Sequence, residues 1–197
     1  MNWEDGLKKI KDILAELGYN ILGYEHKEGQ KAQLEPWYYP KKRGEGLPPD
    51  VSQFLNEWQN KYPLVAVLKK KSIGQQNVDY LTGIKADGLS IENIYDLMAD
   101  VEDTLVEIEK KRFPKKSVKQ AKGGAYWITY TFACIYKNGI SEDIRPKVLG
   151  AHKKVKAVKY SRSLVIDLAN QKVFKHKGFP LNTNAPGPKK LAGLLFG

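Results

Sequence analysis

Residues 125–136 read AYWITYTFACIY, and this stretch decides the fold class that the sequence predicts. From Tyr126 to Tyr136 every second residue is aromatic, aliphatic or cysteine, and this period of two is typical of a β-strand with one buried face. The only cysteine, Cys134, lies within the stretch, where a lone thiol usually packs as a small hydrophobic side chain. The chain can therefore form no internal disulfide, and it offers no pair of cysteines for a zinc site.

Helical periodicity appears on both sides of this strand in the sequence. Apolar residues spaced by three and four predict helices from Trp3 to Leu17 and from Ser90 to about Lys111. Shorter helices are predicted over 50–58, where Asp50 can act as the N-cap, and over 142–152. The remaining segments with strand-like patterns are 19–25, 31–39, 62–68, 155–160, 163–168 and 172–176.

Residues 69–87 show neither the strand period of two nor helical spacing, and they are predicted to form a polar loop. The two strands at 19–25 and 31–39 are expected to pair as a hairpin, because a polar turn separates them. Together these elements predict an α+β fold. We expect a mostly antiparallel mixed sheet with the two main amphipathic helices, those starting at Trp3 and Ser90, packed on one face.

Length and composition predict one main domain. A chain of 197 residues can bury a core unaided, and 42% hydrophobic with 28% charged residues is close to ordinary globular usage. We expect a single domain over 1–181, divided into an acidic half at 1–109 and a basic half at 110–181. A tail rich in Pro and Gly follows at 182–197, and its apolar end at 191–196 is predicted either to dock on the core or to enter a partner's groove.

The start of the chain lacks the basic region and apolar run of a secretion signal. No later window approaches the ~18 consecutive apolar residues of a membrane-spanning helix. The sequence therefore predicts a cytoplasmic protein with no membrane partner.

Charge is distributed unevenly between the two ends of the chain. Residues 1–109 contain 13 Lys/Arg and 19 Asp/Glu, a net charge of −6, whereas residues 110–197 contain 20 and 3, a net charge of +17. A charge that served solubility alone would mix both signs along the chain. We therefore expect a polyanionic partner, DNA or RNA, to bind the C-terminal half.

Two groups of basic residues are the candidates for this binding. The denser group comprises Lys110, Lys111, Arg112, Lys115, Lys116, Lys119 and Lys122, followed by two glycines that let the backbone approach a phosphate. The second group comprises Lys153, Lys154, Lys156, Lys159 and Arg162. Such clusters supply affinity that is independent of base sequence, because they release the counterions condensed on phosphates.

Two tryptophans next to basic runs are candidates for base stacking. Trp37 precedes the basic residues at 41–43, and Trp127 follows the cluster at 110–122. The alternative is that strand aromatics belong to the core and that the lysines cover a solvated face, neutralised in part by the acidic helix at 90–111. The excess of 20 basic over 3 acidic residues favours binding over neutralisation.

Signatures of enzymes are mostly lacking, and no cofactor or metal site is predicted. One pattern supports an alternative function: Glu25 and Lys27 have the Glu-x-Lys spacing of metal-dependent nucleases, although the nearest upstream carboxylates lie on a helix. Glu109 and Lys111 repeat that spacing within a predicted helix.

The sequence thus favours a non-catalytic nucleic-acid-binding accessory protein. Two alternatives stay open: a metal-dependent nuclease with the Glu-x-Lys site, and an assembly protein that pairs acidic and basic faces. Self-association or a protein partner would then use the acidic helix at 90–111 or the tail at 191–196.

Overall fold

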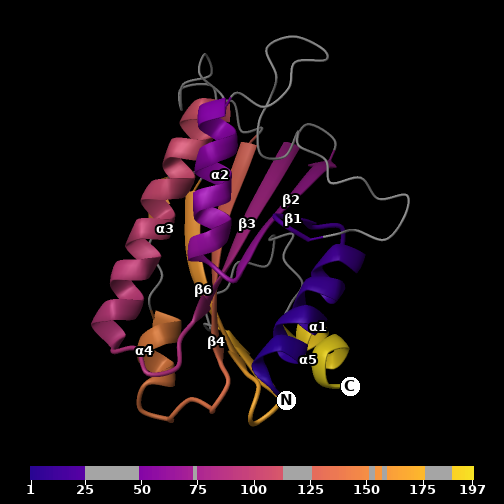
Figure 1. Ribbon diagram of the computed structural model, residues 1–197, viewed down its shortest axis with the longest axis vertical. Coiled ribbons are helices and arrows are strands. Elements are labelled where there is room, and N and C mark those ends of the chain that lie inside the picture. The colour runs from indigo at the N-terminus through magenta and orange to yellow at the C-terminus, as the bar shows by residue number, and fades with distance from the viewer. Residues whose placement is uncertain (25–48, 73–74, 113–125, 151–153, 157–158, 176–187) are drawn as a thin grey trace.

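The stretch that decides the fold class forms β4 (Tyr126–Tyr136), a central strand of a seven-stranded sheet. The computed structural model describes residues 1–24, 49–72, 75–112, 126–150, 154–156, 159–175 and 188–197. At 50–51, 69–72, 75–77, 106–112, 126–128, 154–156, 159–161 and 188–189 it describes the backbone alone. The chain of Figure 1 is drawn in colour over these ranges.

The elements follow one another in a mixed order of helices and strands. The helices are α1 (Trp3–Glu16), α2 (Pro49–Lys61), α3 (Ile91–Arg112), α4 (Arg145–Gly150) and α5 (Pro188–Phe196). The other strands are β1 (Asn20–Ile21), β2 (Leu64–Ser72), β3 (Gln75–Lys85), β5 (Lys154–Lys156), β6 (Lys159–Asp167) and β7 (Lys172–Lys175).

The sheet has a parallel centre and antiparallel margins. The strand order is β1-β2-β3-β4-β6-β5, and β7 also pairs with β6. The strands β3, β4 and β6 run parallel, whereas β1, β2, β5 and β7 join them antiparallel. The prediction of a mostly antiparallel sheet is therefore wrong. The reason is that α3 and α4 are crossover connections, which carry the chain back so that the next strand starts at the same end as the last.

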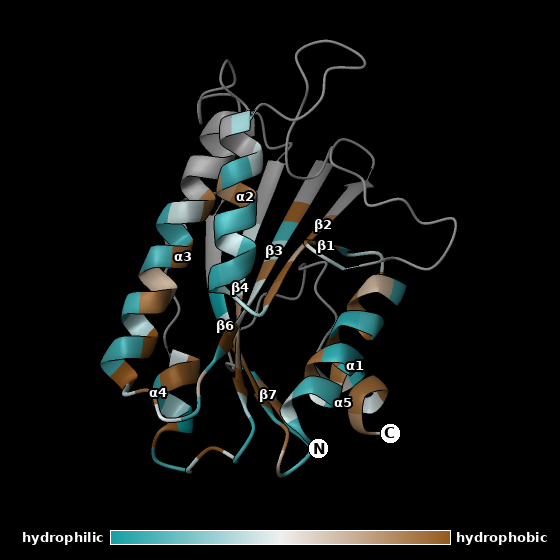
Figure 2. Ribbon diagram, viewed as in Figure 1, coloured by the Kyte–Doolittle hydropathy of each residue, from teal (hydrophilic) through white to brown (hydrophobic). Residues whose placement is uncertain are grey.

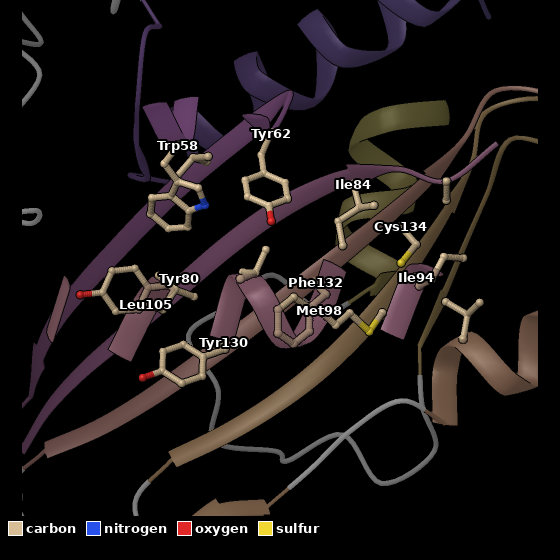
Figure 3. Packing of buried hydrophobic residues seen from close by; sticks show 14 of the residues in the cluster. Trp58, Tyr62, Tyr80, Ile84, Ile94, Met98, Leu105, Tyr130, Phe132 and Cys134 are labelled. Carbon is tan, nitrogen blue, oxygen red and sulfur yellow. The ribbon is translucent and has the colours of Figure 1, made fainter. Parts of the chain in front are cut away.

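Helices cover both faces of the sheet. On one face α2, α3 and α4 pack over Tyr80, Tyr130 and Phe132 (Figure 3), and on the other face α1 and α5 pack over a separate apolar cluster. Figure 2 shows hydrophobic residues concentrated on the strands between these helix layers. The prediction that the two main helices share one face is wrong, because α1 and α3 lie on opposite faces.

The alternation of β4 explains this error. Its large side chains, such as Tyr130 and Phe132, face α3, while Ala133 and Ile135 face α1, and all four are buried. The strand is thus covered on both faces, as central parallel strands usually are. The smaller residues on the α1 side made that face look solvated in the sequence.

The predicted loop at 69–87 is instead the end of β2 and the whole of β3, a central strand. Its polar residues conceal the strand pattern, but Val78, Tyr80 and Ile84 alternate into the α3 side of the core. Gly83 is required for packing, since a Cβ there would lie 2.7 Å from the Cβ of Leu64 on β2. The strand prediction at 31–39 lies outside the described residues.

Helix α1 connects directly into the sheet. The Asn2 side chain accepts a hydrogen bond from the backbone N–H of Asp5 and caps the first turn. At the other end Gly18 has a φ of +87°, and the N–H of Tyr19 donates to the carbonyl of Leu14. This glycine-terminated end turns the chain into β1, which pairs antiparallel with β2.

The predicted tail ends in helix α5, which packs on the core beside α1 near the N-terminus (Figure 1). Leu191 and Leu195 are buried in the cluster on the α1 face, whereas Leu194 is 41% exposed. Of the two alternatives for the apolar end of the tail, docking on the core is therefore the one that the structure shows. In the described part of the chain, no helix combines the length and apolar character needed to cross a bilayer.

Replacing Leu195 by Ala should lower the free energy of unfolding by about 2–5 kcal/mol, because it removes a buried side chain and leaves a cavity. The neighbouring substitution Leu194→Ala, on the exposed side of α5, serves as the control and should cost roughly 0.5 kcal/mol or less. Chemical denaturation of the two variants and the parent protein measures both values. Equal losses would mean that α5 does not pack through this side.

Candidate functional site

The structure removes one residue from the predicted basic surface. The side chain of Arg162 is 2% exposed and lies on the α1 side of β6, where its guanidinium group contacts Asp79 of β3. The prediction that Arg162 belongs to a nucleic-acid-binding surface is therefore wrong. A charged arginine in the interior needs a carboxylate partner, and that partner is hard to recognise in the sequence because Asp79 belongs to the segment predicted to form a loop.

Asp79, Arg162, Tyr19 and Thr131 form a buried polar cluster. The Nη2 of Arg162 donates to Oδ1 of Asp79 at 3.3 Å, and its Nε donates to the hydroxyl of Thr131 at 2.8 Å. The Tyr19 hydroxyl donates to Oδ2 of Asp79 at 2.5 Å, and the Thr131 hydroxyl donates to Oδ1 at 2.9 Å. Each oxygen of the carboxylate is thus satisfied by the protein itself.

Burial governs the ionisation of this cluster. It raises the pKa of Asp79, and the positive charge of Arg162 and the two hydroxyl donors oppose the shift. Burial also lowers the pKa of Arg162, with Asp79 opposing, and it raises the pKa of Tyr19 together with the neighbouring carboxylate. The arginine and the two hydroxyl donors thus stabilise the carboxylate form of Asp79 against its burial, and the contact between Asp79 and Arg162 is a structural ion pair.

Among the other predicted basic residues, those whose backbone the structure describes lie at one end of the sheet. The C-terminal end of α3 carries Lys110–Arg112, and β4 begins at the same end of the molecule (Figure 1). The ladder places Lys159 of β6 opposite Ile128 of β4, and Lys156 of β5 opposite Lys159. The remaining predicted residues, Trp37, Lys115, Lys116, Lys119, Lys122 and Lys153, lie outside the described residues.

A third set of lysines at this end was missed by sequence reasoning. Residues Lys69–Lys71 belong to the last part of β2, and Lys69 is paired with Val78 of β3. One row of the ladder therefore runs from Lys69 through Val78 and Ile128 to Lys159. The three consecutive lysines were visible in the sequence, but they stood in the acidic half and in a segment predicted to be a loop. We call Lys69–Lys71, Lys110–Arg112, Lys154, Lys156 and Lys159 together the basic end.

The opposite end of the sheet carries carboxylates that hold loops in place. Asp87 accepts hydrogen bonds from the backbone N–H groups of Lys137 and Asn138, both at 2.8 Å. Asp167 accepts from the backbone N–H groups of Ile140 and Asn170. These carboxylates follow or end the parallel strands β3 and β6, so the carboxyl ends of the strands are occupied by structural contacts.

The acidic helix has a partner within its own half of the chain. Asp100 of α3 forms an ion pair with Lys61 of α2 at 2.7 Å and accepts a hydrogen bond from the hydroxyl of Tyr62. Glu92, Asp96 and Asp103 are exposed on the outer side of α3. Both side chains of the ion pair are about half exposed, so it contributes roughly 0–1 kcal/mol.

The residues proposed for catalysis gain no support from the described part of the chain. Glu25 and Lys27 lie outside it, and Glu109 and Lys111 are placed only as backbone positions of α3. Among the residues that are described, no group of three or more His, Cys, Asp or Glu side chains could hold a metal ion. Cys134 is fully buried, and burial raises the pKa of its thiol to about 12, so it stays protonated at neutral pH.

The chain matches no protein-family model, no curated protein and no solved structure. Its residues and their arrangement are therefore the evidence for its function.

Breaking the buried ion pair should lower the free energy of unfolding far more than breaking the exposed one. Arg162→Met leaves the Asp79 carboxylate buried without its cation and should lower the free energy of unfolding by about 3–5 kcal/mol. Lys61→Met, which breaks the exposed pair with Asp100, should cost about 1 kcal/mol or less. Urea unfolding of both variants provides the comparison.

The double variant Asp79→Leu/Arg162→Met completes the cycle, since it leaves no isolated charge. It should be more stable than the sum of its two single variants implies. Additive losses, or a loss for Arg162→Met as small as that for Lys61→Met, would contradict the assignment of a buried ion pair.

Proposed function

We propose that this protein binds nucleic acid through the basic end, as a non-catalytic accessory protein. The observation that carries the proposal is the convergence of lysines and arginines from separate segments, β2, α3, β5 and β6, on one end of the sheet. Solvated lysines that serve solubility have no reason to gather at one end of the fold. A nucleic acid has phosphates at the density that such a surface requires.

The chain between α3 and β4 strengthens the proposal. It starts at Arg112 and returns at Tyr126, so both of its anchor points belong to the end of the molecule where the basic residues gather. Four more lysines of the sequence occupy this segment, at 115, 116, 119 and 122. In the sequence, these four lysines thus fall between two positions that belong to this end of the sheet.

Three described carboxylates have partners outside the basic end. Asp100 of the acidic helix pairs with Lys61 of α2, and Asp87 and Asp167 at the far end of the sheet accept hydrogen bonds from backbone N–H groups. A concentration of positive charge at one end of the sheet favours association with a polyanion there.

Binding to a long DNA or RNA should weaken steeply with salt, because phosphate neutralisation dominates such a site. A plot of log affinity against log salt concentration should have a slope that corresponds to release of about four or more counterions. Fluorescence anisotropy of labelled DNA and RNA over a salt series measures this slope. Binding that is insensitive to salt, or no binding at low salt, would refute the proposal, and cleavage on adding magnesium or manganese would favour the nuclease alternative.

The affinity for nucleic acid should depend more on where the lysines lie than on the net charge of the protein. Changing Lys115, Lys116, Lys119 and Lys122 to Glu should reduce affinity at least ~10-fold, because each lost phosphate contact becomes a repulsion. The melting temperature should change by only a few degrees.

A matched control places four reversals away from the basic end. Lys8 and Lys9 of α1, Lys137 after β4 and Lys172 of β7 are exposed, and two of them belong to the basic half of the sequence. Lys11 and Lys61 are unsuitable, because Lys11 is partly buried and Lys61 is in an ion pair. Equal weakening by the two quadruple variants would show that net charge alone governs binding and that the basic end is not the site.

A further inference from the structure

The ladder brings a cation, an amide and an aromatic ring into one row at the basic end. Lys70 of β2 is paired with Asn77 of β3, and Asn77 is paired with Trp127 of β4. Neighbouring strands are about 4.8 Å apart, so the backbones at Lys70 and Trp127 are separated by about 10 Å. Residues in one row of a sheet lie next to one another across the strands, so the register brings these three residue types together.

The chemistry of this row fits one unpaired nucleotide. An indole ring offers a face on which any base can stack, a lysine neutralises a phosphate, and an amide can donate to and accept from the edge of a base. No comparable combination is needed to hold a duplex, whose bases are stacked on one another and whose phosphates require only cations.

The next row on the same side limits how far such a ligand can extend. It contains Asp79 and Thr129, which are 1% and 7% exposed, and Asp79 is held in the buried polar cluster. This neighbouring row is therefore closed to a ligand. A nucleic acid that binds at the first row is expected to run across the end of the sheet, where the lysines of β2 and β6 lie.

From this juxtaposition we propose that the basic end takes single-stranded nucleic acid, with one base stacked on Trp127 and an adjacent phosphate bound by Lys70. Asn77, between them in the row, contacts the edge of the stacked base. This inference rests on the proposed function and adds to it the class of nucleic acid and the residues that select it. It assigns a binding role to Lys70, a residue of the acidic half of the chain.

The test uses the full chain with oligothymidylate, oligouridylate and a DNA duplex of equal length. Trp127→Ala should weaken binding to the single strands about tenfold, the cost of one lost stacking contact, while binding to the duplex stays within about twofold. Trp127→Phe keeps an aromatic face and should bind within about threefold of the parent protein. Lys70→Gln should reduce the salt slope by about one counterion.

A tryptophan and a lysine at the far end of the sheet supply the matched control. Trp3 begins α1, and the Nζ of Lys85 lies 5.3 Å from the centre of its ring. Trp3→Ala and Lys85→Gln alter the same residue types away from the basic end, so neither should change affinity for single strands. Intrinsic fluorescence provides a second reading: quenching by oligothymidylate should be reduced in Trp127→Phe and unchanged in Trp3→Phe, even if Trp127→Ala does not fold.

The outcomes separate this inference from the proposed function. If the parent protein binds neither single strands nor duplex, the proposed function is wrong and this inference falls with it. If it binds duplex as tightly as single strands, or if Trp127→Ala behaves like Trp3→Ala, salt-dependent binding at the basic end stands and the single-strand site is overturned.

Discussion

The ion pair between Asp79 and Arg162 joins β3 to β6 across the strand between them, and the register of the parallel centre depends on it. The Thr131 hydroxyl of β4 bonds to both charged groups, so three adjacent strands share one cluster. A slip of one residue in β3 or β6 would move one charge to the α3 face, away from its partner. An isolated buried charge is so costly that the pair disfavours every register except the observed one.

The two faces of the sheet follow from that register. With the polar cluster on the α1 side, Tyr80, Tyr130 and Phe132 face α3, where Tyr80 and Tyr130 pack with ring centres 6.0 Å apart. The α1 side receives the smaller residues of the strands and is closed by α1 and α5. The chain ends thereby lie together, and the apolar end of the tail is used within the protein itself.

The parallel centre also sets the polarity of the molecule. Strands β3, β4 and β6 all start at the end where α3 finishes, so basic residues near those boundaries gather there. Open sheets with parallel strands often bind ligands at the carboxyl ends of the strands. In this protein those ends carry Asp87 and Asp167, whose oxygens are engaged by backbone N–H groups. The basic end and the row of Lys70, Asn77 and Trp127 lie at the other end.

Local sequence patterns were enough to predict the helices from Trp3 and Ser90, strand β4, the burial of Cys134 and the charge asymmetry between the halves. These follow from periodicity and composition, which neighbouring residues carry. Only the tertiary structure decided that residues 75–85 are a central strand and that Arg162 is interior, because Asp79 looks like a loop residue until Arg162, 83 positions away, neutralises it. The proximity of Lys69–Lys71 to Trp127 also depends on the tertiary structure. These residues are far apart in the sequence, and the pairing of β2, β3 and β4 brings them together.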